Sequence, residues 1–124
     1  MSTPKKVKYL QVGTNLALFW AEHSPDGGYS WGGDAGKIAQ SDQIEIPTPF
    51  RQLDAERAIV SASLSHIIHP QGSGRWAVEV LDTDEIDGLD DKKALLVKFK
   101  VTTHGDSRAA VEGISFFGAV SGKP

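Results

Sequence analysis

The chain has 124 residues, enough for one domain with a hydrophobic core and too few for two. Its net charge of −3 and pI near 5.7 argue against a nucleic-acid partner, and no apolar run approaches the ~20 residues that insert into a membrane. The absence of cysteine excludes disulfides, a thiolate nucleophile and zinc sites with Cys ligands. We therefore expect a single soluble domain over residues 1–124. No signal peptide is visible at its start, and the compartment, including secretion or the cell surface, stays open.

The first 40 residues are expected to hold an N-terminal strand and a glycine-rich loop. The segment 6–23 is rich in apolar residues, and its short length fits either a helix or a buried strand; we favour the strand. Residues 24–36, SPDGGYSWGGDAG, are crowded with Gly, Asp and Ser and predict a loop or a wide hairpin tip. This loop also carries two aromatic residues, Tyr29 and Trp31.

In the second part of the domain, residues 41–124, apolar and polar residues alternate in several segments with the period of a strand. A short edge strand is predicted around Ile44 and Ile46, and Pro47 ends it. Four stronger strands are predicted at 57–67, 75–82, 94–103 and 110–120. Their expected inward residues are Val60, Ala62, Leu64, Trp76, Val78, Val80, Leu95, Val97, Phe99 and Val101. With the N-terminal strand, this predicts a six-stranded antiparallel β-sandwich in the all-β class.

Two polar clusters contain residue types that can bind a metal ion, but neither has the ligand spacing of a metal site. In the connection TDEIDGLDDKK, residues 83–93, the acidic residues miss the position-five ligand and position-six glycine of a helix-loop-helix calcium loop, so a solvated hairpin tip is expected. His66 and His69 are three residues apart, but Pro70 follows and the pair leaves a strand. We expect no metal site and no cofactor.

The segment 104–107 places His, Gly, Asp and Ser in succession. Adjacent residues of an extended chain point in alternate directions, so Ser107, His104 and Asp106 cannot form a catalytic triad, and no enzyme is expected. Asp106 fits either a ligand contact or a turn stabilised by side-chain to backbone hydrogen bonds. Arg75 fits either a ligand contact or an ordinary surface position.

Four segments occur in a characteristic order from Ile44 onward. IEIPTPF, residues 44–50, is similar to an opening strand I-x-F-x-x-P-aromatic, with Ile46 for the usual Phe. AIVSASLSHI (58–67) and GRWAVEV (74–80) stand where an apolar strand and a strand opened by Arg are expected. THGDSRAAVEGISFFGA, residues 103–119, follows T-W-G-D-T-x-x-Y-x-x-x-V-S-W-x-A without a gap. In this order the chain resembles the H-type lectin domain, the family of the snail agglutinin and of the C-terminal domains of the slime-mould discoidins.

The resemblance implies a six-stranded antiparallel sandwich that assembles as a homotrimer or a dimer of trimers. It also implies a lectin that binds galactose- or N-acetylgalactosamine-type glycans in clefts between protomers. By the same resemblance, the sugar-binding residues are Gly32 and Asp34 of a G-x-D element, Arg75, and His104, Gly105 and Asp106 of the T-W-G-D element.

The chain departs from the family at two aromatic positions. His104 stands where the family has Trp, and Ala110 where it commonly has Tyr, which removes stacking surface worth about 1 kcal/mol. Trp31, or Tyr29 in the same loop, would supply an aromatic platform instead. These departures permit a second interpretation, a structural or assembly domain that keeps the trimeric sandwich and has lost sugar binding. For association itself, the candidate contacts are Ile59, Leu96 and one of the pair Phe116 and Phe117, which fall on opposite faces of their strand.

Overall fold

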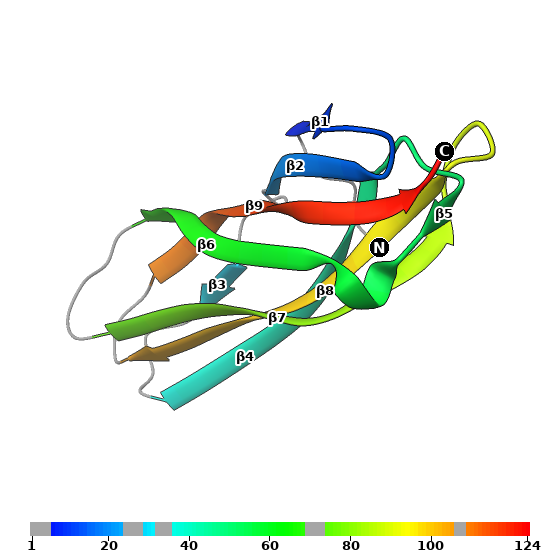
Figure 1. Ribbon diagram of the computed structural model, residues 1–124. Helices are drawn as coiled ribbons and strands as arrows, with labels where there is room; N and C mark the ends of the chain where they lie inside the picture. Colours follow the sequence, from blue (N-terminus) through cyan, green and yellow to red (C-terminus); the bar gives the residue numbers. More distant parts are fainter. Residues whose placement is uncertain (1–5, 24–28, 32–35, 69–73, 106–108) are drawn as a thin grey trace.

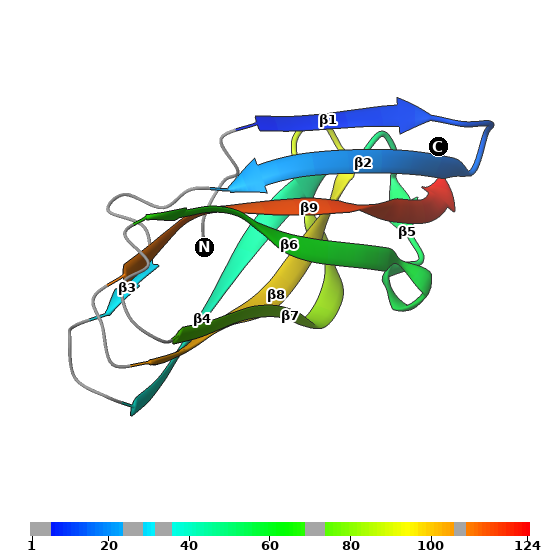
Figure 2. The same cartoon turned by 90° about the vertical axis from the view of Figure 1, so that its left-hand side faces the viewer.

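A computed structural model describes residues 6–23, 29–31, 36–68, 74–105 and 109–124 (Figures 1 and 2). Antiparallel strands form two sheets packed face to face, which confirms the predicted all-β sandwich. The elements in chain order are β1 (Lys6–Gln11), β2 (Leu16–His23), β3 (Tyr29–Trp31), β4 (Gly36–Pro47), β5 (Gln52–Leu53), the 3-10 helix η1 (Ala55–Arg57), β6 (Ile59–Ile68), β7 (Gly74–Asp87), β8 (Lys93–Gly105) and β9 (Ala109–Lys123).

The larger sheet is organised around β9. Strands β1 and β2 lie on one side of β9, and β6 lies on the other. The short strand β3 pairs with the beginning of β9 and β5 with its end. The smaller sheet has the order β4–β8–β7, so β8 is its central strand. Ribbons of the two sheets cross over one another in both views (Figures 1 and 2).

The core lies between the sheets and is built from the alternating positions of β2, β4, β8 and β9. All four inward residues predicted for β8 are at most 1% exposed. The rings of Phe99 in β8 and Phe116 in β9 meet edge to face with centroids 5.0 Å apart, which ties the smaller sheet to the larger one. Val78 and Val80 of β7 pack against this core, as predicted. The predicted core side chain of Trp76 lies outside the described side chains.

The structure has nine strands in its described ranges where six were expected. The segment 6–23 is not one strand but a hairpin, since β1 and β2 pair antiparallel around a turn in which Gly13 has φ +96°. Within the predicted loop 24–36, residues 29–31 form β3. These additions complete the larger sheet, and they were missed because short strands carry little periodicity.

The acidic segment 83–93 is also different from the prediction. Its first five residues continue β7 to Asp87, and only Gly88–Lys92 connect β7 to β8. A register shift between Val80 and Asp82 marks a β-bulge, which moves the following residues to the opposite face. The alternation visible before Val80 is therefore broken at the bulge, although the pairing with β8 continues.

Among the described residues, no helix has the length and apolar character needed to cross a membrane.

Candidate functional site

The strand register brings two of the predicted site residues to adjacent backbone positions. Arg75, near the beginning of β7, is the Cα partner of His104, near the end of β8. Gly105, the next residue of β8, pairs with Gly74 on one side and with Gly36 of β4 on the other. Three glycines therefore meet across the smaller sheet beside the Arg75 and His104 pair.

Trp31 reaches the same end of the sandwich from the larger sheet. It lies in β3 and pairs with Ala109, the first residue of β9 (Figures 1 and 2). The remaining predicted site residues, Gly32, Asp34 and Asp106, lie outside the described residues. The structure thus brings together the backbone positions of Arg75, His104 and Gly105, and it locates Trp31 in a strand that pairs with the start of β9.

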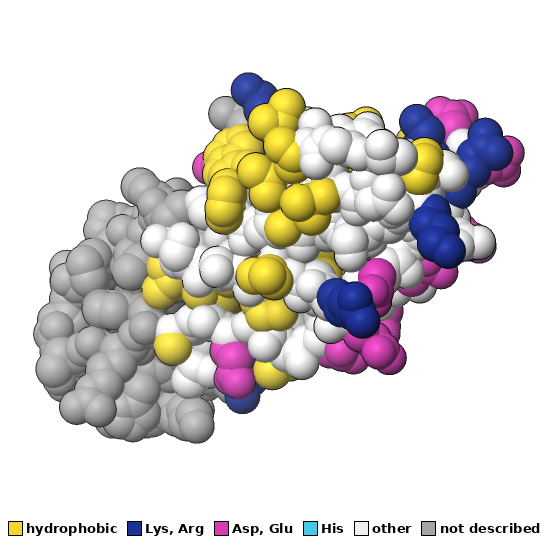
Figure 3. Space-filling model, in the orientation of Figure 1, with side chains coloured by type: hydrophobic (Ala, Val, Ile, Leu, Met, Phe, Trp, Pro, Cys, Tyr) yellow, Lys and Arg dark blue, Asp and Glu magenta, His cyan; other side chains and the backbone are white. Residues whose placement is uncertain are grey.

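The outer surface of the larger sheet carries an apolar face that crosses four strands. The pairing aligns Leu10 of β1, Leu18 of β2, Ala119 of β9 and Ile59 of β6 in one row, and Phe117 lies in the next row beside Trp20. We call these six residues the apolar face. Ile59 is 69% exposed, Leu10 64% and Phe117 58%. Figure 3 shows hydrophobic side chains gathered over β1, β2 and β9. A contiguous exposed patch of this kind is typical of a contact surface.

The structure shows which of the predicted contact residues are exposed and which are buried. Phe116 is fully buried while Phe117 is exposed, so one phenylalanine of the pair belongs to the core and the other to the surface, as predicted. Ile59 is exposed as expected. Leu96 is different: it is only 8% exposed and is counted among the buried residues, so it is not part of an exposed face. Leu10, Leu18 and Trp20 were not predicted, because their strands had been read as a single segment.

Several of the described charged residues form ion pairs at the surface. On the smaller sheet, Lys98 lies 3.3 Å from the Asp84 carboxylate. Near the hairpin tip, a hydrogen bond and the positive charge of Lys93 lower the pKa of Asp87, and the same contact raises the pKa of Lys93. Both groups are solvent-exposed, so the pair contributes little to stability. Within the described ranges, no group of three or more His, Cys, Asp or Glu residues could hold a metal ion.

His23 is buried between the two sheets. His23 in β2 is 2% exposed, and its Nε2 atom lies 3.7 Å from an Asp42 carboxylate oxygen across the two sheets. Its ring meets Phe99 edge to face at a centroid distance of 6.0 Å. This places His23 within the core packing and away from the predicted sugar site.

No family model, no curated protein and no solved structure matches this chain.

Proposed function

We propose that the chain is a carbohydrate-binding protein, a lectin that takes galactose- or N-acetylgalactosamine-type sugars in clefts between the protomers of a trimer. The observation that carries the proposal is the register of β7 and β8, in which Arg75 and His104 are Cα partners beside three glycines. Binding a sugar without a metal requires hydrogen-bond donors and acceptors, and Arg and His side chains carry both kinds of group. The aromatic platform in this proposal is Trp31 of β3.

In this proposal, assembly into a trimer raises the affinity for glycans that carry several sugars. A shallow site for one sugar binds weakly, and three such sites on one particle bind a multivalent glycan far more tightly through their effective concentration. The apolar face gives the chain a surface suited to association, because Ile59 and Phe117 are both more than half exposed.

Calorimetric titration with galactose, N-acetylgalactosamine, glucose and fucose tests the proposal. Wild-type protein should bind one of the galactose-type sugars with a millimolar or tighter Kd. Replacing Arg75 with Ala removes the charged donor and should weaken binding at least about tenfold, since such a hydrogen bond contributes about 1.5–3 kcal/mol. Arg57→Ala is the matched control, because the Arg57 side chain is 84% exposed and belongs to η1. No binding of any of the four sugars at millimolar concentration would reject the lectin.

Two further variants test the aromatic contribution. Trp31→Ala should abolish detectable sugar binding, because the loss of one ring contact moves a millimolar site beyond the concentrations of the titration; unchanged binding would reject Trp31 as the platform. His104→Trp restores the aromatic ring of the resembled family, and one ring contributes about 0.5–1.5 kcal/mol. We therefore expect roughly two- to tenfold tighter binding from His104→Trp.

The second candidate is an assembly domain that trimerises without binding sugar, and the apolar face favours it. Mass photometry and sedimentation should show a trimer for either candidate. Exchanging Ile59 and Phe117 together for Ser should dissociate it, because both side chains are exposed in the single chain. A trimer that binds no glycan identifies the assembly domain, and a monomer at micromolar concentration contradicts both candidates.

A further inference from the structure

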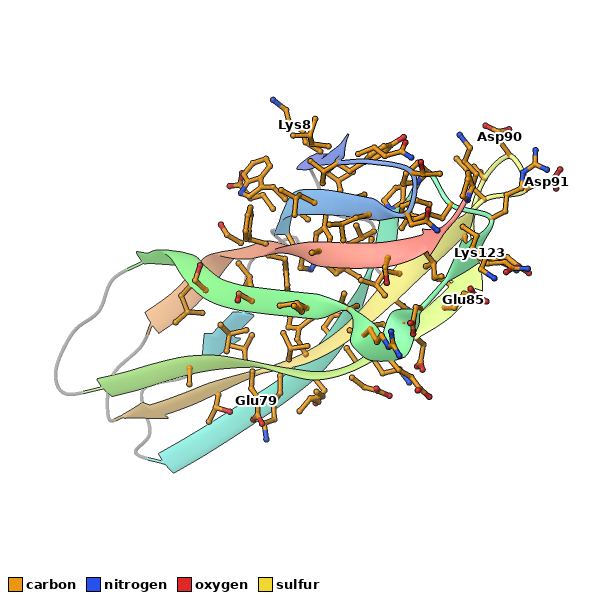
Figure 4. All side chains as sticks on the ribbon, viewed as in Figure 1. Lys8, Glu79, Glu85, Asp90, Asp91 and Lys123 are labelled. Carbon is orange, nitrogen blue, oxygen red and sulfur yellow. The ribbon has the colours of Figure 1, made fainter. Side chains whose placement is uncertain are left out.

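A cavity of about 400 Å³ opens between β1, β4 and the tip of the β7–β8 hairpin. It lies at the opposite end of the smaller sheet from Arg75 and His104, and Figure 4 labels Asp90 at the hairpin tip beside it. Its volume falls in the range of small-molecule sites, roughly 300–1,000 Å³. The side chains that matter for its chemistry are those of Tyr9, Glu45, Thr48, Leu89, Asp90 and Lys92.

The floor of the cavity is held in place by hydrogen bonds between the β4–β5 connection and the start of β8. Thr48, only 5% exposed, donates its hydroxyl hydrogen bond to the Lys93 carbonyl oxygen at 2.6 Å. The Lys93 backbone N–H donates to the Phe50 carbonyl oxygen at 2.7 Å, and Phe50 itself is fully buried. The cavity is therefore preformed in the free protein, and a ligand pays little to order it.

The lining combines an aromatic residue with charges of both signs. Tyr9 is 47% exposed at the edge of the larger sheet. Glu45 and Asp90 bring carboxylates and Lys92 brings an ammonium group, whereas the Lys93 ammonium is bonded to Asp87. An anion would be repelled by the two carboxylates and a cation by the Lys92 ammonium, so an ion of either sign meets a like charge in the cavity. Hydroxyl groups, in contrast, donate to the carboxylates and accept from the ammonium group, while the aromatic ring suits the apolar C–H face of a sugar ring.

We propose that this cavity is a second binding site, which takes an uncharged, polyhydroxylated ring of pyranose size. Asp90 accepts hydrogen bonds from its hydroxyl groups, Lys92 donates to them, and Tyr9 contacts its apolar face. None of these residues belongs to the site between β7 and β8, so the two proposals stand or fall separately.

The hairpin turn offers a matched pair of variants. Asp90 and Asp91 both have positive φ, +58° and +59°, in a turn closed by the Lys92 N–H donating to the Leu89 carbonyl oxygen at 3.1 Å. Asn tolerates this backbone conformation at least as well as Asp. Asp90→Asn and Asp91→Asn therefore remove one negative charge each from neighbouring turn positions without breaking the turn, but only Asp90 lines the cavity.

The test is an NMR titration of the full chain with galactose, glucose and mannose, and with phosphate and glycine as charged probes. A sugar should shift the amide signals of Tyr9, Leu89 and Lys92 with a millimolar Kd. Asp90→Asn should raise that Kd about tenfold and Asp91→Asn by less than about twofold, because a charged hydrogen bond contributes about 1.5–3 kcal/mol. Both variants should melt at or above the wild-type temperature, which excludes unfolding as the cause.

The proposal would be overturned by no shifts with any sugar, by shifts with phosphate or glycine instead, or by equal weakening by the two variants. Shifts confined to the amides of Arg75 and His104 would also overturn it while supporting the site between β7 and β8. Conversely, shifts at the hairpin tip that persist in Arg75→Ala would show that the second site binds sugar independently of the site between β7 and β8.

Discussion

Gly118 lies where β9 passes between β2 and β6, and replacing it with Ala should destabilise the fold severely. Gly118 pairs with Phe19 on one side and Val60 on the other. A Cβ atom added there would lie 1.9 Å from the Ile59 carbonyl oxygen and 2.9 Å from the Phe19 ring, whereas ordinary contact begins at 3.4 Å. The obstacle is backbone, so it cannot rotate away. Glycine is therefore required at position 118, because even a methyl side chain would collide with the neighbouring strand.

The stability lost in Gly118→Ala depends on which part of the structure must move to admit the methyl group. Ile59 can retreat only if β6 separates from β9, which loses backbone hydrogen bonds of about 1 kcal/mol each in addition to an overpacking cost of about 1–3 kcal/mol. We expect Gly118→Ala to lower the free energy of unfolding by at least about 3 kcal/mol, a large part of the usual 5–15 kcal/mol. With a urea m-value of about 1–3 kcal/mol/M, the midpoint should fall by roughly 1–3 M.

Urea unfolding followed by circular dichroism measures this change. Ser61→Ala is the control, because Ser61 is an exposed residue of β6, the strand that Gly118 of β9 approaches, and loss of its hydroxyl should change stability by less than about 0.5 kcal/mol. If Gly118→Ala unfolds within about 0.5 kcal/mol of wild type, the close approach of β6 and β9 described above is wrong.

Three further predictions concern other parts of the fold. Phe116→Ala should cost about 3–5 kcal/mol in urea unfolding, and Phe117→Ala less than about 1 kcal/mol in the monomer, because only Phe116 is buried. The pKa of Asp87 is lowered by Lys93, so the stabilisation from their contact is present above the unfolded pKa of 3.8 and is lost as pH falls through the folded value. Because this exposed pair adds little to the free energy of unfolding, the check is an NMR titration, in which the Asp87 carboxyl should be half-protonated below pH 3.8 in wild type and nearer to 3.8 in Lys93→Ala; the same midpoint in both proteins contradicts the assignment. Asp91→Gly should raise the melting temperature, since Gly adopts the φ of +59° without strain of about 1 kcal/mol; a lower melting temperature would argue against the turn.

The strands that the sequence predicted well are those buried along one complete face. In β8, Val97 and Phe99 alternate with Lys98 and Lys100, so burial and period coincide and the inward residues were correctly identified. Phe116 was also separable from Phe117, because adjacent strand residues must point to opposite faces.

Irregular features hid the rest of the fold. The bulge after Val80 breaks the alternation of β7, and the acidic residues beyond it resemble a loop although they remain paired to β8. The turn signal at Gly13 was present within residues 6–23, but each flanking strand is too short to show a period of its own. The apolar face could not be predicted either, because it requires the pairing of four strands that are distant in sequence.

The sequence could predict which residues belong to the candidate site, but not how they are arranged in space. Arg75 and His104 were selected by resemblance, and their distance in sequence says nothing about contact. Their pairing depends on the register of the β7–β8 hairpin, which the bulge and the Gly88–Lys92 connection set together. The cavity at the hairpin tip was not predicted, because the residues that line it come from separate segments of the sequence.

The most direct test of the sugar-binding proposal is a crystal structure of the chain soaked with N-acetylgalactosamine. We predict a trimer with sugar density at the end of the sandwich where β7 begins and β8 ends, in contact with Arg75 and in a cleft completed by a second protomer. A monomer with no sugar at that end, at a concentration that saturates a millimolar site, would contradict the proposal.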